Sequence, residues 1–403
     1  MKPWPGRSAD IGFTLLLAFL LLINFSIAAC YFLFSVLVVW MMVDGWRRKA
    51  WPPLPRFYLF FVLYAFFTLV STVFSVAPLA SLRDNRELLI LLLFPVYWFF
   101  LESEAKKRLA LAAVLVSAFL SASLGVVLIL RKGISLISLS DRLKGLTSHW
   151  MTYSGLLMLV FIYFSVRLLE AKGKQRTWWL IPVLTVILAA IIFSLTRSAW
   201  IGIGAAGFLY LLIFKPRFLL PAVPVLVALV LLLPVSVRQR VYSIVDLKEG
   251  SNRDRLHMAY TGWKIFLDRP LFGVGANNIP QVYERYRHPA ANNVNPHLHN
   301  NFVQILAERG IFALISFLLA LAFLLAELVA KIRRPGQAAS RPVGQAADRA
   351  GTIAVLFTLV GFLVAGFFEY NFGDSEIKFL LFFFLSLPFL KTAGDKNGAL
   401  EKS

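Results

Sequence analysis

The sequence is poor in charge and almost without cysteine. Of its 403 residues only 15% are charged and 59% are hydrophobic, whereas a soluble globular chain carries about 25% charged residues. Its one cysteine, Cys30, lies inside an apolar run, so an intrachain disulfide cannot form and a cysteine-based metal site is not expected. These shortages exclude a soluble enzyme, a disordered chain and a secreted disulfide scaffold.

Acidic residues are scarce as well: 21 Asp and Glu stand against 41 Lys and Arg, which gives a net charge of +20. In a soluble chain this excess would indicate nucleic acid. Here, however, long apolar runs are present, and a bilayer-crossing helix needs roughly 20 mostly apolar residues. We expect an all-α polytopic membrane protein with about 12 transmembrane helices. The runs are 9–24, 27–43, 57–76, 87–101, 109–130, 152–169, 178–194, 199–214, 218–237, 300–329, 352–370 and 376–391.

Lysine and arginine alternate between the loops in a way that sets the orientation. They are concentrated in 44–56, 102–108, 170–177 and 330–350 and are sparser in the short loops between these segments. By the positive-inside rule, the lysine-rich and arginine-rich segments and both termini face the cytoplasm. The orientation of the chain in the membrane therefore explains the excess of positive charge, and we expect no nucleic-acid partner.

One outer loop departs from the pattern of short connections. A loop longer than about 15 residues is usually functional or disordered, and residues 238–299 exceed this length. Apolar side chains recur at helical spacing over 252–267, and GVGANN (273–278) is typical of a turn. We expect 1–403 to be a single integral membrane domain that includes 238–299 as a helical outer-loop subdomain. The inner loop 331–350 has the composition of a plain linker.

Ionisable residues at the outer ends of the apolar runs indicate a site. Charged and imidazole groups at membrane depth are costly, so by default they suggest function. Arginine presents a planar fork that suits phosphate oxygens, and histidine can accept a proton near neutral pH. Together they predict a metal-free group transfer from a polyprenol-linked diphosphate at the membrane surface. The residues are His149, Arg197, Arg253, Arg255, His297, His299, Glu369, Asp374 and Glu376.

Each of these residues also has a purely structural interpretation. His299 could only cap the following helix, Arg197 could be an interfacial anchor, and Arg253 and Arg255 could be the solvated start of a helix. The acidic residues could only pair with basic ones. His297-x-His299 offers metal-ligand types, but an i, i+2 pair without a third ligand is weak, so we expect no metal and no cofactor.

Two glycine-rich strings do not indicate nucleotide binding. GIGAAG (202–207) fits G-x-G-x-x-G, but it lies within an apolar run and no strand precedes it. We expect Gly202, Gly204 and Gly207 to allow close helix packing instead. GVGANN lacks the lysine of a P-loop.

Five motifs, in order along the chain, resemble those of a known family. PHLHNNFVQILAERGIFALI (296–315) resembles the H-x-H-N…L…E-x-G signature of the O-antigen ligase and O-antigen polymerase superfamily, and DRPLFGVGANN (268–278) resembles the segment that precedes it there. NRDRLHMAYTGWKIF (252–266) resembles the family's arginine-bearing helix, SLTRSAW (194–200) its arginine turn, and EYNFGDSEI (369–377) its acidic turn. The N-terminal half matches only in hydropathy.

The resemblance implies a GT-C-like glycosyltransferase of the bacterial inner membrane, with its active site facing the periplasm. Such enzymes take glycan from undecaprenyl diphosphate, without a metal and with inversion at the anomeric carbon. His299 matches the catalytic histidine, and Arg197 and Arg255 match the diphosphate-binding arginines. Arg253 remains an alternative, because Met258 stands where many members have tryptophan. The candidate supporting residues are His297, His149, Asn300, Glu369 and Asp374.

The acceptor separates the activities that the resemblance allows. A ligase transfers glycan to lipid A-core, whereas a polymerase joins carrier-linked repeat units. The number of expected spans and the one principal outer loop favour the ligase, whose partners would be the undecaprenyl-diphosphate-linked glycan, lipid A-core and membrane lipids. A protein O-glycosyltransferase is less favoured, because those relatives extend into a larger outer domain. From other classes, a lipid-linked sugar transporter would need paired repeats, which the sequence does not contain, and a structural scaffold would need no reactive histidine.

Overall fold

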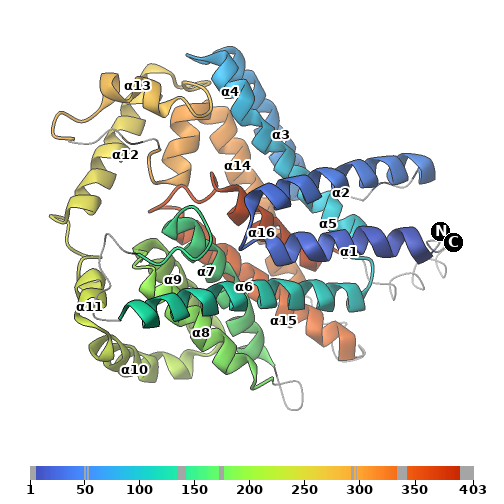
Figure 1. Ribbon diagram of the computed structural model, residues 1–403. Helices are drawn as coiled ribbons and strands as arrows, with labels where there is room; N and C mark the ends of the chain where they lie inside the picture. Colours follow the sequence, from blue (N-terminus) through green and yellow to red (C-terminus); the bar gives the residue numbers. More distant parts are fainter. Residues whose placement is uncertain are drawn as a thin grey trace.

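The chain folds into a bundle of α-helices, as the computed structural model shows (Figure 1). The structure describes residues 6–49, 51, 54–133, 142–171, 177–291, 295, 297–333 and 343–390. No strand occurs among these residues, so the all-α prediction is confirmed.

The elements follow one another along the chain from the N-terminal to the C-terminal side of the described residues. In order they are α1 (Gly6–Leu22), α2 (Ile27–Arg48), α3 (Arg56–Val73), α4 (Pro78–Asp84), the 3₁₀-helix η1 (Asn85–Leu92), α5 (Leu93–Phe100), α6 (Glu104–Lys132), α7 (Trp150–Glu170), α8 (Leu180–Phe193), α9 (Arg197–Phe214), η4 (Pro216–Phe218), α10 (Leu219–Leu232), α11 (Val235–Tyr242), α12 (Gly250–Asp268), α13 (Ile279–Tyr286), α14 (Asn301–Arg333), α15 (Val343–Ala365), α16 (Ser375–Ser386) and η5 (Leu387–Phe389).

Among the described residues, six helices are long and apolar enough to cross a membrane: α2, α3, α6, α7, α9 and α14. Shorter apolar helices accompany them in α1, α8, α10 and α15. These elements coincide with ten of the twelve apolar runs of the sequence. The prediction of a polytopic membrane protein is therefore confirmed, while the number of crossings stays a prediction.

The two remaining runs, 87–101 and 376–391, are not single α-helices, which corrects the expected element type. The first is η1 followed by α5, and the second is α16 followed by η5, with residue 391 outside the described residues. A 3₁₀-helix rises about 2.0 Å per residue against 1.5 Å in an α-helix, so these segments reach about 28 and 24 Å. All residues of α16 are buried. Because protein encloses such a helix, it need not have the length of a lipid-exposed span.

Helix α16 lies inside the bundle, and other helices surround it (Figure 1). The ring of Phe379 on this helix lies 5.3 Å from Phe19 and 5.4 Å from Tyr31 between centroids. Tyr97 on α5 donates a hydrogen bond to the Phe379 carbonyl at 2.8 Å. Lipid tails are as apolar as these rings, so close packing and internal hydrogen bonds hold such helices together. This packing fixes where α16 begins, and its first turn belongs to the site described below.

Close packing explains one of the three glycines in GIGAAG. A Cβ at Gly202 would lie 2.7 Å from both the Gly361 carbonyl oxygen and the Met158 sulfur, so α9 meets α15 and α7 there without an intervening side chain. A Cβ at Gly204 or Gly207 would meet nothing within 4 Å. The prediction that these two glycines permit close helix packing is therefore wrong, because both lie on the exposed face of α9.

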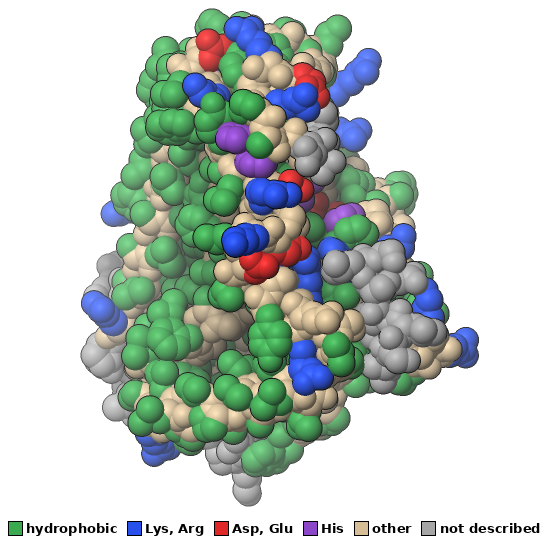
Figure 2. Space-filling model, turned by 90° about the vertical axis from the view of Figure 1, so that its left-hand side faces the viewer, with side chains coloured by type: hydrophobic (Ala, Val, Ile, Leu, Met, Phe, Trp, Pro, Cys, Tyr) green, Lys and Arg blue, Asp and Glu red, His purple; other side chains and the backbone are tan. Residues whose placement is uncertain are grey.

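The two ends of the bundle differ in their side chains. At one end, Lys107 contacts Glu104 at 2.9 Å and the Leu390 carbonyl at 3.4 Å, and the Lys331 ammonium lies 5.1 Å from the Phe389 ring. The opposite end, which we call the site end, carries α4, α11, α12 and α13 (Figure 1). Figure 2 looks onto the site end, where basic, acidic and histidine side chains form a band beside hydrophobic surface.

Several lysines and arginines that the sequence analysis places in the inner loops or the C-terminal segment lie outside the described residues: Lys172, Lys174, Arg176, Arg334, Arg341, Lys391, Lys396 and Lys402.

The outer loop 238–299 contains α11, α12 and α13. The helix expected in this loop is present as α12. Its apolar side chains Leu256, Tyr260 and Trp263 are 57%, 38% and 52% exposed. The opposite face of α12, which includes Met258, packs against α13 and the loop before α14. An apolar stripe therefore remains on the surface of the site end.

The expected inner linker 331–350 is shorter than its composition indicated. Helix α14 continues to Arg333, and α15 begins at Val343. The parts of this range that the structure describes are therefore helical, and residues 334–342 lie outside the described residues.

Candidate active site

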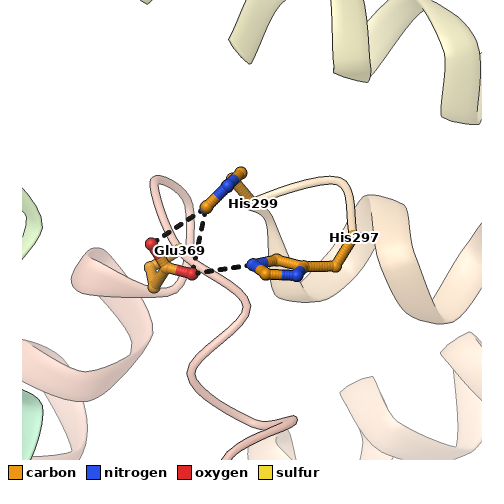
Figure 3. A group of neighbouring side chains, drawn as sticks. All are labelled: His297, His299 and Glu369. Atoms are coloured by element: carbon orange, nitrogen blue, oxygen red, sulfur yellow. Dashed lines mark hydrogen bonds and ion pairs between the residues drawn. The ribbon is translucent and has the colours of Figure 1, made fainter. Parts of the chain in front are cut away.

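Three residues predicted for the site meet in one group, which we call the histidine group (Figure 3). His299 Nδ1 lies 3.0 and 2.9 Å from the two carboxylate oxygens of Glu369, and His297 Nε2 lies 3.4 Å from Glu369 Oε1. The two imidazole centroids are 4.3 Å apart. Both histidines precede α14, whereas Glu369 lies between α15 and α16. The sequence places these residues at one end of the molecule without indicating that they touch.

Backbone geometry brings His299 to this carboxylate. His299 has a φ of 48°, in the left-handed region that residues other than glycine adopt rarely and that is frequent at functional sites. The next residue, Asn300, caps α14 by accepting hydrogen bonds from the Phe302 and Val303 N–H groups at 2.9 and 3.0 Å. Its side chain also donates to the Phe367 carbonyl at 3.0 Å. Asn300 therefore ties the histidine loop to the loop that carries the carboxylate.

The turn GVGANN supports the same loop by docking at a kink in α14. Gly310 interrupts α14 with a φ of 77°, and a Cβ there would collide with the Leu271 backbone. Gly275 donates its N–H to the Glu308 carbonyl at 2.8 Å, and Asn277 donates its N–H to the Glu308 carboxylate at 2.9 Å. The segment DRPLFGVGANN (268–278) and the E-x-G part of the signature, Glu308 and Gly310, therefore form one structural unit.

The two histidines keep Glu369 ionised. Burial alone would raise the pKa of Glu369, but the charge of His299 and the hydrogen bonds from both histidines hold it well below its usual range. For His297, burial acts to lower the pKa, and the hydrogen bond to Glu369 together with its negative charge raises the pKa above its ordinary value. The carboxylate therefore stabilises an imidazolium beside it, which is what a general base requires once it has taken up a proton.

The contact to Glu369 also decides what the other nitrogen of His299 can do. When Nδ1 donates to the carboxylate, the neutral ring carries its proton there, and Nε2 keeps a lone pair. No described residue hydrogen-bonds to this Nε2. The arrangement leaves an acceptor nitrogen for a substrate hydroxyl.

Arg255 joins the histidine group through the residue before Glu369. Its Nε donates to the Phe368 carbonyl at 3.0 Å, and its terminal nitrogens make no ion pair with a described residue. Burial lowers the pKa of Arg255, while the negative charge of Glu369 acts in the opposite direction. Arg253, the alternative left open by the sequence, is exposed, and it makes no ion pair with a described acidic residue. The geometry favours Arg255 over Arg253.

Arg197 belongs to a second group, the arginine clamp, which surrounds Glu249. Its Nη1 donates to the carbonyl and hydroxyl oxygens of Ser243 at 2.7 and 3.0 Å. Its Nη2 donates to Glu249 at 3.1 Å and to Ser251 at 2.5 Å, and Arg240 donates to the other Glu249 oxygen at 3.0 Å. Although burial acts to raise it, the hydrogen bond from Ser251 and the charge of Arg197 lower the pKa of Glu249 to about 2. Protein atoms therefore occupy both terminal nitrogens of Arg197.

Asp374 and His149 reach the site end from two further elements. Asp374 accepts a hydrogen bond from the Thr152 hydroxyl at 2.8 Å, which joins the start of α16 to the start of α7. Burial and the nearby charge of Glu369 raise the pKa of Asp374 to about 7, although the Thr152 hydrogen bond opposes them. His149 caps α7, with its Nδ1 accepting the Met151 N–H at 3.2 Å, and burial lowers its pKa. The structure therefore gives His149 a capping role.

Helix N-termini converge on the site end. Helices α7, α9, α12, α14 and α16 all begin here. Thr152 of α7 bonds to Asp374 before α16, Arg197 of α9 bonds to Ser251 of α12, and Asn301 of α14 accepts the Phe372 N–H before α16. Each helix N-terminus carries the equivalent of about +0.5 elementary charge and has unsatisfied N–H groups that favour an anion. With the arginines and histidines they make this end electropositive, which suits a diphosphate.

The histidine group also has the composition of a metal site. The ligand atoms of His297, His299 and Glu369 lie within 4.8 Å of one another. The structure thus supplies the third ligand that the spacing of the two histidines did not indicate. Two imidazoles and one carboxylate are also the ligand types of some catalytic zinc sites. The group can hold a divalent cation or act as a carboxylate–histidine base, and the two roles require separate tests.

Sequence reasoning missed three charged residues of the site end, Glu249, Arg240 and Arg142. Glu249 directly precedes α12, a position where acidic residues are common, and this was its one signal. Arg142 lies in the loop before α7, with its guanidinium 4.9 Å from the Trp150 ring. Burial and the positive charges of Arg197 and Arg255 lower the pKa of Arg142. Its signal in the sequence was an arginine in a short outer loop, where the positive-inside rule disfavours arginine.

Two comparisons relate the chain to known proteins. Residues 182–318 match the family model described as O-Antigen ligase, and this range contains Arg197, Arg255 and His299. A stretch of 75 residues is 37% identical to the teichuronic acid biosynthesis protein TuaE of Bacillus subtilis (strain 168), and it covers 19% of this chain and 15% of that protein. The chain therefore aligns with less than a fifth of this curated relative. Through residues 182–318, the resemblance to the O-antigen ligase and polymerase superfamily is confirmed.

Proposed function

We propose that this protein is a membrane glycosyltransferase that moves a glycan from undecaprenyl diphosphate to an acceptor hydroxyl. The observation that carries the proposal is the pair of His299 and Glu369, in which one imidazole nitrogen is held at 2.9 Å and the other has no hydrogen-bond partner among the described residues. The pair lies beside arginines and helix N-termini that attract an anion. A base next to an anion-binding surface is what transfer from a lipid diphosphate requires. The match to the O-antigen ligase family supports the same reaction class.

In the proposed reaction His299 acts as the general base. Its Nε2 takes the proton of the acceptor hydroxyl, the acceptor oxygen bonds to the anomeric carbon, and the bond from that carbon to the diphosphate oxygen breaks. The electron pair of the broken bond stays on the diphosphate, where Arg255 stabilises the growing charge. The proton stays on His299, where Glu369 stabilises the imidazolium. Attack opposite the leaving group inverts the anomeric centre, and the scheme uses no metal.

For the acceptor we favour lipid A-core, which makes the protein a ligase. The description of the matched family and the single large outer loop support this choice. The alternative is a polymerase that joins carrier-linked repeat units. The name of the relative TuaE refers to teichuronic acid biosynthesis and not to a ligase, so the polymerase stays the second candidate.

We further propose that the site end faces the periplasm of a bacterial inner membrane, with both termini in the cytoplasm. Lys107 and Lys331 at the opposite end support this orientation through the positive-inside rule. The orientation also suits the donor, because a polyprenol-linked glycan can be presented at the outer leaflet, whereas nucleotide sugars are cytoplasmic.

The proposal is tested by His299→Ala in the purified protein, supplied with the carrier-linked glycan. Because general base catalysis contributes about 10²- to 10⁴-fold, we expect transfer to fall by about 1,000-fold while folded protein is still recovered at a normal level. His288→Ala, at an outer-loop histidine that stacks on His257 away from the histidine group, is the matched control and should keep its activity. Normal transfer by His299→Ala at a normal protein level would end the assignment.

Two further measurements separate the alternatives. In the metal-free scheme, treatment with EDTA leaves transfer unchanged, whereas a loss that a divalent cation restores would assign His297, His299 and Glu369 to a metal. The surface polysaccharide of a deletion strain separates the acceptors. Carrier-linked polymer without attachment to lipid A means a ligase, and attachment of single repeats means a polymerase.

A further inference from the structure

The proposed function requires cations with free donors, and one arginine outside the predicted set has them. Arg142 lies in the loop between α6 and α7. Its Nε is buried without a hydrogen-bond partner, and its guanidinium makes no ion pair with a described residue. The group is held by the face of Trp150, 4.9 Å from the ring centroid. A cation–π contact of this kind leaves the N–H donors of the arginine without acceptors.

The contrast with Arg197 is direct. Arg197 gives its terminal nitrogens to Ser243, Glu249 and Ser251. An incoming diphosphate would have to displace a carboxylate before it could bind there. Arg142 offers a guanidinium fork that no described residue occupies, and Arg255 uses only its Nε, on a backbone carbonyl. These two arginines can therefore accept an anion without breaking a contact between described residues.

Arg142 lies in the electrostatic range of both groups of the site end. The charges that act on it are those of Arg197, Arg255 and Glu249. Arg142 in turn acts on His149, which also senses Glu369 and both histidines of the histidine group. Helix α7 begins at Trp150 itself, so its N-terminus adds positive potential beside the guanidinium. Arg142 therefore connects the arginine clamp with the histidine group.

The two carboxylates that contact this cluster of cations already have partners. Glu249 is already shared by Arg197 and Arg240, and Glu369 is held by the two histidines. Like charges repel most where burial reduces solvent screening. A diphosphate brings several negative charges and pairs of oxygens that match a guanidinium fork, so it offsets this repulsion.

We infer that Arg142 binds the diphosphate of the polyprenyl carrier together with Arg255, while Arg197 positions the outer loop through Glu249. The inference rests on the proposed function and goes beyond it. The resemblance implies that Arg197 and Arg255 bind the diphosphate, and the inference replaces this pair by Arg142 and Arg255. Arg197 becomes a positioning residue, and Arg142 a ligand of the leaving group.

The test is binding of inorganic diphosphate to the full-length protein in detergent, measured by isothermal titration calorimetry. A hydrogen-bonded charge pair is worth about one to two orders of magnitude in affinity, so Arg142→Gln should bind about 10- to 100-fold more weakly. Arg142→Lys should recover only part of this loss, because lysine keeps the charge without the fork. Lys144→Gln removes an exposed charge from the same loop and should change the affinity less than about twofold.

The inference is overturned if the wild-type protein shows no saturable binding of diphosphate, or if Arg142→Gln binds as tightly as the wild type. A second measurement needs no variant and covers the case in which Arg142→Gln fails to fold. Phenylglyoxal modifies accessible arginines, and peptide mass spectrometry identifies them. Diphosphate should protect Arg142 and Arg255 and leave Arg131 unprotected. Modification of Arg142 at an unchanged rate in saturating diphosphate also overturns the inference.

Transfer assays with the same variants distinguish this inference from the proposed function. If the wild-type protein transfers no glycan, but its diphosphate binding depends on Arg142, the proposed function fails and the inference stands. If the wild-type protein transfers glycan and Arg142→Gln retains both binding and transfer, the inference alone fails.

Discussion

Two glutamates at the site end organise basic residues in different ways. Glu249 holds Arg197 and Arg240 at 3.1 and 3.0 Å, and serine oxygens take further guanidinium donors of Arg197. Glu369 holds His299 through one nitrogen at 2.9 Å and leaves the other nitrogen without a partner in the described part of the chain. The first arrangement is saturated within the protein, whereas the second has an available atom.

The comparison teaches how to divide a cluster of charged residues into structure and chemistry. A guanidinium whose terminal nitrogens already have protein acceptors is suited to holding a loop in place. An imidazole that is oriented by a carboxylate and still carries a lone pair is suited to accepting a proton.

The contrast between the two glutamates would be lost most clearly if Glu369 were not needed for glycan transfer. Glu369→Gln keeps a hydrogen-bonding side chain but removes the charge that stabilises the imidazolium, so we expect transfer to fall by about 1,000-fold. Because Glu369 raises the pKa of His297, the variant should also lower that pKa, which NMR titration of the labelled histidines would detect. Glu284→Gln, at an exposed position on α13, is the control. Turnover equal to that of the wild type would remove the carboxylate from the mechanism.

The arginine clamp should behave as a structural pair. Removing one partner of a buried ion pair costs roughly 3 kcal/mol, because the other charge is left without compensation. We expect Arg197→Gln and Glu249→Gln each to lower the free energy of unfolding by about this amount, and the double variant to cost less than the sum. Unfolding experiments in mixed micelles on the wild type, the two single variants and the double variant measure the coupling free energy of this double-mutant cycle.

The exposed pair of Arg287 and Glu284, 2.9 Å apart, provides the reference cycle, with a coupling below about 0.5 kcal/mol. Additive effects of Arg197→Gln and Glu249→Gln on stability would show that the two residues are not coupled and would return Arg197 to the diphosphate site.

Asp374 should make stability depend on pH. Its pKa is raised from an ordinary value of 3.8 to about 7, so between these values the folded protein keeps a proton that the unfolded chain releases. Stability from this group is complete below about pH 4 and is lost as the pH rises through about 7, with a slope of up to about 1.4 kcal/mol per pH unit. Asp374→Asn should flatten this decline in unfolding experiments from pH 4 to 8. An identical pH profile in the variant would contradict the assignment.

The smallest effect is expected at His149, which acts as a helix cap in the structure. His149→Ala should lower the free energy of unfolding by about 1 kcal/mol, because the Met151 N–H loses its acceptor. Transfer should stay within about threefold of the wild type. Ser103→Ala removes the cap of α6 at the opposite end and serves as the reference. A loss of transfer of about 100-fold at His149 would move this residue into the chemistry.

Much of the fold follows from hydropathy, and the exceptions have a common cause. The long apolar runs predicted helices such as α6 and α14, because any segment that crosses lipid must satisfy its own backbone hydrogen bonds. Hydropathy could not show that α16 is short and wholly enclosed, since burial by protein and burial by lipid have the same composition. It also could not show that Gly204 and Gly207 face outward, because neighbours decide what a glycine permits.

The candidate site, like the fold, could be predicted from the sequence only in part. The order of the motifs and the positive-inside rule are enough to place Arg197, Arg255, His299 and Glu369 at one end of the molecule. They leave the partners of each group open, because His299 and Glu369 are 70 residues apart in the chain and no local rule connects them. For the same reason, the sequence pattern does not distinguish Arg142 from an ordinary loop charge.

By itself, the sequence determined that this chain is a helical membrane protein with imidazole and guanidinium groups gathered at one end, because hydrophobic length and charge asymmetry act through the solvent and need no partner. The tertiary structure alone decided which arginine gives both terminal nitrogens to described residues and which does not, and which nitrogen of His299 those residues leave without a partner. Those properties depend on distances of about 3 Å between atoms from different helices, and only packing sets such distances.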